Sequence, residues 1–119
     1  MSAAPHDDHP WLLSHLATIR TLPGSFLGDE RVETLRSYLA GYEQAREDLG
    51  LPRYTKKESK ILSDFDIWIA KRVGYELSWG SSRWPQLIKE IDSSKKSAVT
   101  FFRVFEEFLQ SNGTSLDEA

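Results

Sequence analysis

The fold of this chain is decided by its most apolar stretch, Ala98-Val99-Thr100-Phe101-Phe102-Arg103-Val104-Phe105-Glu106-Glu107-Phe108-Leu109. Phe101, Phe105 and Phe108 recur at the three- and four-residue spacing that places side chains on one face of a helix. We therefore predict a helix over about Ser94–Gln110, ended by Asn112-Gly113. Its apolar side is too broad for a surface helix, so we expect it to lie at the centre of the molecule.

Four further helices are expected before it, and no strand pattern is present. One of them has strong signals at both ends: Thr55 and Glu58 have the spacing of a capping box, and Gly74 is a typical helix stop. The expected helices run from about His9 to Arg20, from Glu30 to Leu49 with Asp29 as cap, from the Thr55 cap to Gly74, and from a Ser81 or Ser82 cap to Ile91. The connections are short, which predicts an all-α fold, a compact single-domain bundle of about five helices.

The boundaries of that domain follow from the same pattern. We expect a flexible N-terminus over residues 1–8, a helical domain over 9–110 and a disordered tail over 111–119. Between the first two helices, two glycines and a proline bracket Phe26-Leu27, which predicts a shaped turn with this apolar pair directed inward. Gly41, in the middle of a helix, indicates that a neighbouring helix approaches closely there.

Composition excludes several classes of function. The 119 residues include no cysteine, so disulfides and thiolate chemistry are absent, as is usual in a reducing cytoplasm. Fifteen basic and 18 acidic residues give a net charge of −3 without a basic stripe, which argues against nucleic acid as a partner. No apolar run is long enough for a bilayer and the start lacks a signal-peptide pattern, so we expect a cytoplasmic protein, without a membrane partner.

Catalytic and metal sites have weak support in the sequence. His6, Asp7, Asp8 and His9, with His15 nearby, have metal-ligating side chains, but most lie in a terminus expected to be flexible, and no second cluster completes the ligand set. Asp64 and Asp66 are two residues apart on a helix and point in nearly opposite directions, so they cannot act as a carboxylate pair. The serines lack a nucleophile-elbow spacing. We therefore expect neither an enzyme nor a bound cofactor or metal.

Protein binding is the remaining class of function. Trp11, Tyr75 and Trp79 lie at helix ends or in a connector, where a large aromatic side chain either fills the core or anchors a partner. For a single aromatic, filling the core is the more common outcome. Acidic side chains would attract a basic partner. The candidate partner-binding residues are Glu43, Glu47, Tyr75, Glu76 and Trp79.

The order of several motifs resembles a family of small all-helical bacterial proteins of the toxin-immunity type. Residues 19–28 and 35–45 are similar to its opening pattern, I-x-x-R-P-x-M-Y-L-G followed by L-x-x-F-I-x-G-Y-x-x-A. Residues 64–69, 84–88 and 98–108 are similar to its D-F-x-x-W-[VI], W-x-x-I-I and A-x-x-x-F-F-x-x-x-x-E-F elements. The resemblance implies a helical fold and a monomeric protein that binds a toxin domain, for example a basic nuclease, and blocks its active surface.

The chain departs from the opening part of that pattern around Pro23, so the family's side chains there do not carry over. Leu22 stands where the family has arginine, and Ser25-Phe26 where it has Met-Tyr. The alternative function is a helical regulatory or small-ligand-binding protein without a toxin partner. A pocket with converging polar groups would favour that alternative, whereas a flat acidic face would favour toxin binding.

Overall fold

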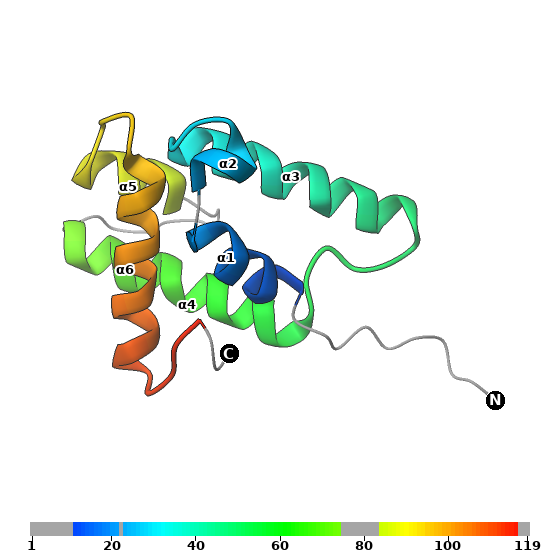
Figure 1. Ribbon diagram of the computed structural model, residues 1–119. Coiled ribbons are helices and arrows are strands. Elements are labelled where there is room, and N and C mark those ends of the chain that lie inside the picture. Colours follow the sequence, from blue (N-terminus) through cyan, green and yellow to red (C-terminus); the bar gives the residue numbers. More distant parts are fainter. Residues whose placement is uncertain (1–10, 22, 75–83, 117–119) are drawn as a thin grey trace.

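Six helices and no strand make up the part of the chain that the computed structural model describes, residues 11–21, 23–74 and 84–116. Their arrangement is drawn in Figure 1. The all-α, single-domain prediction is confirmed, with one helix more than expected. The helices are α1 (Trp11–Thr21), α2 (Pro23–Leu27), α3 (Val32–Asp48), α4 (Lys56–Val73), α5 (Trp84–Ile91) and α6 (Ser97–Ser111).

The additional helix, α2, occupies the place of the predicted turn between the first two long helices. Pro23 begins it, because proline is well suited to the first turn of a helix. The backbone N–H of Gly28 donates to the carbonyl oxygen of Gly24 at 2.9 Å, and Gly28 has a φ of 84°, which ends the helix. Leu27 packs half-buried against the core as expected, while the side chain of Phe26 lies outside those described.

Helix α6 supplies more buried residues to the core than any other described helix, as its apolar sequence leads us to expect. Phe101 and Phe105 are 1% and 0% exposed. The ring of Phe65, on α4, meets Phe105 edge to face with centroids 4.9 Å apart, and Trp84, on α5, lies 4.7 Å from Phe101. Such aromatic contacts add to the large apolar area that each ring removes from water. This one cluster therefore joins α4, α5 and α6.

Both predicted boundaries of α4 are confirmed. The Thr55 hydroxyl accepts from the Glu58 N–H, and the Glu58 carboxylate accepts from the Thr55 N–H, each at 3.1 Å. At the other end, Gly74 has a φ of 81°, a left-handed conformation that costs a residue with a Cβ about 1–2 kcal/mol. Local sequence alone therefore defines the length of α4.

The start of α3 depends on α6 instead of the cap we expected at Asp29. Asp29 organises the turn before the helix by accepting from the Arg31 N–H at 2.9 Å. The N–H of Val32 donates to the Ser97 hydroxyl at 2.8 Å, and the N–H of Ala98 donates to the Glu30 carbonyl, also at 2.8 Å. The first turns of α3 and α6 thus satisfy each other's free backbone groups.

The first N–H of α5 likewise donates to a side chain from another helix. Asp66, buried on α4, accepts from the backbone N–H of Trp84 at 3.0 Å. A carboxylate at this position satisfies a free donor and interacts favourably with the positive end of the helix. The caps that we expected, Ser81 and Ser82, lie outside the described residues.

The expectation of a disordered tail from residue 111 is wrong for its first part. Leu116 is 3% exposed and belongs to the core cluster. Its N–H donates to the carboxylate of Glu106, which also holds Arg20 of α1 at 2.8 Å. Residues 1–8 and 117–119 lie outside the described part of the chain.

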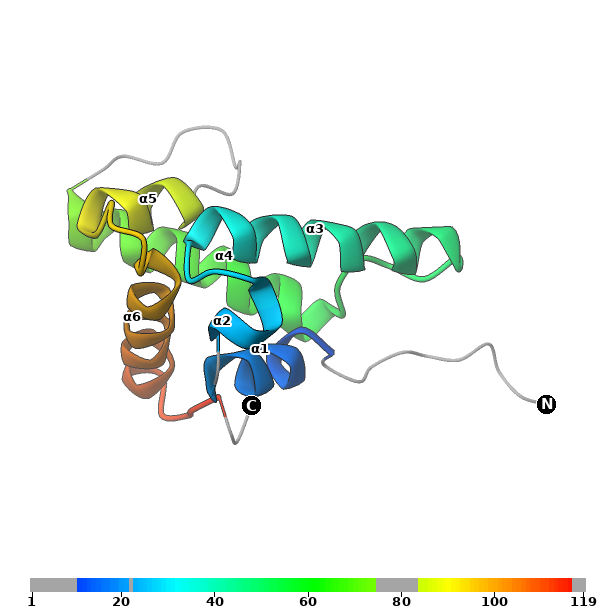
Figure 2. The same cartoon turned by 45° about the horizontal axis from the view of Figure 1, so that its top comes forward.

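Helix α3 extends beyond the rest of the bundle. In both Figure 1 and Figure 2 its second half projects past the start of α4, away from α6. The long axis of the molecule, 49 Å against 32 and 27 Å, reflects this extension. One side of this half faces the bundle and the other faces solvent, so α3 carries two different surfaces.

Candidate functional site

An aromatic cluster joins the second half of α3 to α1. Trp11 is 5% exposed and stacks on Tyr42, with ring centroids 4.5 Å apart, and on Tyr54 at 5.7 Å. Its indole N–H donates to the carbonyl oxygen of Arg53 at 3.0 Å. Trp11 therefore fills the core, the more common of the two roles considered for it.

Glu43 is buried, although the sequence made it a candidate partner-binding residue. It is 4% exposed on the side of α3 that faces the bundle. Its carboxylate accepts from the hydroxyl of Tyr54, lies 3.3 Å from an Arg36 nitrogen and 3.6 Å from an Arg53 nitrogen. A buried carboxylate needs such donors, and their presence makes Glu43 a structural residue.

Of the other four candidate partner-binding residues, the structure describes one, Glu47. Glu47 stays at the surface, where the Arg53 guanidinium donates to both of its oxygens at 2.8 and 3.0 Å. These hydrogen bonds lower the pKa of Glu47, because they stabilise its charged form. Tyr75, Glu76 and Trp79 lie outside the described residues. The structure therefore brings Glu43 and Glu47 together around Arg53 but turns only Glu47 toward solvent.

A groove of about 260 Å³ lies between α3 and α4. Its lining includes Glu43 and Asp66, the two carboxylates that accept intrachain hydrogen bonds, together with Tyr54. Trp84 and Leu62 supply apolar lining. The sequence analysis missed this groove.

Three polar side chains along the groove have spare hydrogen-bonding capacity. Arg36 makes one contact with the described residues, the 3.3 Å contact with Glu43, and its side chain is 40% exposed. Ser59 and Ser63 are exposed and separated by one turn of α4, and neither hydroxyl bonds to a described residue. The sequence offers two signals for this cluster. Arg36 and Glu43 are seven residues apart and the two serines are four apart, so each pair shares one face of its helix.

The solvent-facing side of α3 is built from small residues. Our expectation that a helix packs closely against Gly41 is wrong, because a Cβ added there would meet nothing within 4 Å. Ala40 and Ala45 are exposed on the same part of the helix. Tyr42 and Leu49 add apolar surface, with exposures of 36% and 77%.

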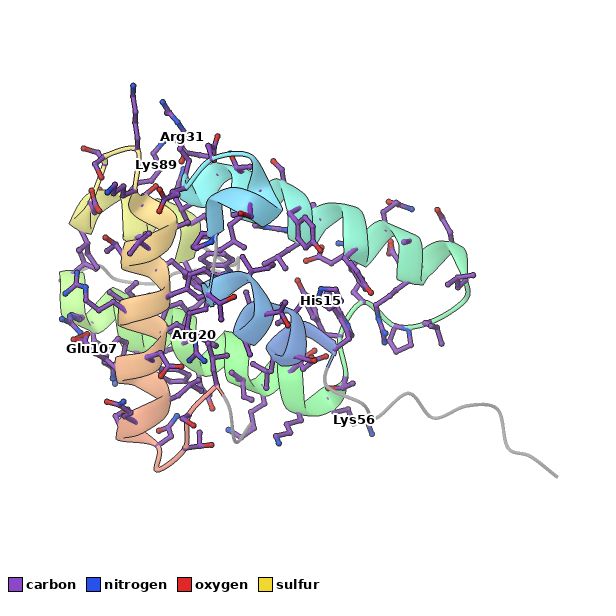
Figure 3. All side chains as sticks on the ribbon, in the orientation of Figure 1. His15, Arg20, Arg31, Lys56, Lys89 and Glu107 are labelled. Atoms are coloured by element: carbon purple, nitrogen blue, oxygen red, sulfur yellow. The ribbon has the colours of Figure 1, made fainter. Side chains whose placement is uncertain are left out.

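Within the described part of the chain, no three His, Asp or Glu side chains form a group that could hold a metal ion. Asp64 pairs with Lys60 at 2.8 Å on the outer side of α4, whereas Asp66 is buried against the start of α5. The two carboxylates therefore point in different directions, as predicted. His15 is half-buried against Tyr42 and lies beside α3 in Figure 3, and in residues 11–21, 23–74 and 84–116 it joins no group of three metal-ligating side chains. His6, Asp7, Asp8 and His9 lie outside the described residues.

A search of the described helices finds none with the length and apolar character that a membrane span requires. Comparisons of the chain with protein-family models, with curated proteins and with solved structures found no match.

Proposed function

We propose that this protein is an immunity protein that binds a bacterial toxin domain through the solvent-facing side of the second half of α3. We call this surface the α3 docking face and define it by Gly41, Tyr42, Ala45, Asp48 and Leu49. The order of the motifs described above supports the toxin-immunity assignment. One of those motifs, G-Y-x-x-A, corresponds to Gly41, Tyr42 and Ala45, all of which are exposed.

The observation that carries the docking face is the open space around Gly41. A glycine within a helix costs about 1 kcal/mol relative to alanine. Within residues 11–21, 23–74 and 84–116 no contact at Gly41 offsets that cost, since a methyl group there would touch none of these residues. A partner that packs directly against the helix backbone would make the missing side chain useful. Tyr42 and Leu49 then provide larger side chains for contact next to Gly41 and Ala45.

Charge at the end of α3 favours a basic partner. Glu47 and Asp48 are exposed in the last turn of α3. Their charges would increase the rate of association with a basic domain such as a nuclease, in the way that complementary charges steer other complexes. A stable interface buries about 1,600 Å² in total, more than half a helix provides. The connector residues Tyr75, Glu76 and Trp79 remain our proposed second part of the interface, in a monomeric cytoplasmic protein.

The experiment is a protection assay. The proposal predicts that a gene next to this chain's own encodes a large secreted protein. The C-terminal domain of that protein, expressed from an inducible promoter in a sensitive bacterium, is the toxin probe. Co-expression of the wild-type chain restores growth, and the purified pair forms a one-to-one complex on gel filtration. Continued killing in the presence of folded, soluble protein would reject the proposal.

The groove between α3 and α4 gives the second candidate function, small-ligand binding, a specific observation. Its volume of about 260 Å³ is just below the usual range of ligand sites, and polar groups converge on it. Glu43 and Gly41 are two residues apart on α3 and point in nearly opposite directions. The groove and the α3 docking face therefore lie on different sides of one helix and can be tested separately.

A further inference from the structure

The groove between α3 and α4 contains a partly committed guanidinium. Arg36 meets Glu43 through one nitrogen at 3.3 Å, which is longer than a strong ionic hydrogen bond. A guanidinium has five N–H donors, so most of those on Arg36 remain open to the groove. Ser59 and Ser63, from the facing helix, add two hydroxyls that donate to no described residue. The available groups at this site are therefore predominantly hydrogen-bond donors.

The two carboxylates of the groove do not cancel this donor character. Glu43 is already shared between the hydroxyl of Tyr54 and two guanidinium groups. Asp66 accepts from the first N–H of α5, where the positive end of the helix compensates its charge. The uncommitted side of Arg36 therefore favours a negatively charged group.

We propose that the groove between α3 and α4 binds a small carboxylic acid. The planar carboxylate matches the paired donors of Arg36, and its second oxygen also accepts from the hydroxyls of Ser59 and Ser63. The volume of about 260 Å³ limits the ligand to a short body, and Leu62 and Trp84 favour an apolar one. The carboxylate belongs either to a free acid or to the C-terminus of a peptide, since both present the same group on a short apolar body.

The test is an NMR titration of the ¹⁵N-labelled full chain with 3-methylbutanoate and, separately, with N-acetylglycylleucine. Saturable shifts confined to the amides of Ser59, Ser63, Trp84 and their neighbours support the site. If 3-methylbutanoate binds more tightly, the natural ligand is a free acid. If N-acetylglycylleucine binds more tightly, it is the C-terminus of a peptide. The neutral amide, 3-methylbutanamide, and inorganic phosphate are the control ligands. Shifts of equal strength with either control would overturn the proposal.

Variants connect the binding to the proposed donors. Arg36→Gln lowers the affinity for the tighter-binding probe by about tenfold or more, the size expected for the loss of hydrogen bonds to a charged group. Arg72→Gln is the matched control, because Arg72 pairs with Glu107 and lies outside the groove. Undiminished binding to Arg36→Gln would overturn the proposal.

A second variant covers the case in which Arg36→Gln disturbs folding by releasing Glu43. Replacing both serines, S59A with S63A, changes only exposed helical positions and weakens binding by about threefold or more. Full affinity in this double variant would also overturn the proposal. The site does not rest on the α3 docking face, so Gly41→Gln should leave the titration unchanged even where it abolishes toxin binding.

Discussion

The carboxylate of Glu58 lies 2.6 Å from the backbone nitrogen of Leu12 and so connects the start of α4 to the start of α1. The same side chain, which is 0% exposed, accepts from the N–H of Thr55 in the capping box. One buried carboxylate therefore satisfies free backbone donors at the starts of two helices, and Leu12 lies 46 positions from Glu58 in sequence.

Glu58→Ala should lower the free energy of unfolding by about 2–4 kcal/mol, because two buried N–H groups lose their acceptor. Urea denaturation followed by circular dichroism measures the change. Glu107→Ala is the control, since its partly exposed pair with Arg72 contributes at most about 1 kcal/mol. Similar small losses for both variants would show that the Glu58 contacts do not stabilise the fold.

Two glycines should respond to alanine in opposite directions. Gly41→Ala should raise the free energy of unfolding by about 0.5–1 kcal/mol, because the site is helical and open. Gly74→Ala should lower it by about 1 kcal/mol or more, because its φ of 81° is unfavourable for a residue with a Cβ. Thermal unfolding of the two variants measures both effects. A destabilised Gly41→Ala variant would mean that the helix is packed against something at this position.

The packed end of the chain predicts a large effect at Leu116. Leu116→Ala should cost about 2 kcal/mol or more, because the side chain is 3% exposed within the core cluster. Leu49→Ala, at 77% exposure, removes the same atoms from the surface and should change stability by less than about 0.5 kcal/mol. Chemical denaturation of the pair distinguishes a packed Leu116 from a disordered one, for which both losses would be equally small.

Stability should decrease on mild acidification because of His15. Burial lowers the pKa of His15, since desolvation disfavours the imidazolium form. The unfolded chain therefore binds a proton first as the pH falls through the ordinary histidine value of about 6.5, which favours unfolding below that pH. The free energy of unfolding, measured from pH 7.5 to 5.5, should fall more in the wild type than in His15→Gln. Parallel profiles would contradict this account.

Local signals predicted the fold well, and contacts between distant residues explain what they missed. The capping box of Thr55 and the stop at Gly74 depend on residues within one turn, and both are confirmed. The first N–H groups of α3 and α5 donate to Ser97 and Asp66, which are 65 and 18 positions away in sequence. Spacing along a single helix cannot reveal such partners.

The candidate site illustrates the same limit. The spacing of Glu43 and Glu47 correctly places both carboxylates near one side of α3. It cannot show that Tyr54 and Arg53, from the following connection, cover Glu43 and leave only Glu47 exposed. Similarly, the sequence marks Gly41 as unusual, but only the folded chain shows that its open side faces solvent.

The central claim is that a toxin domain packs on the α3 docking face, and Gly41→Gln tests it most directly. Glutamine is a better helix former than glycine and meets open space there, so the variant should be at least as stable as the wild type. Isothermal titration with the toxin domain used in the protection assay should show binding by the wild type and at least tenfold weaker binding by Gly41→Gln, equivalent to about 1.4 kcal/mol. Lys60→Gln, an exposed helical control on α4, should bind like the wild type. Unchanged affinity of a folded Gly41→Gln variant would contradict the account.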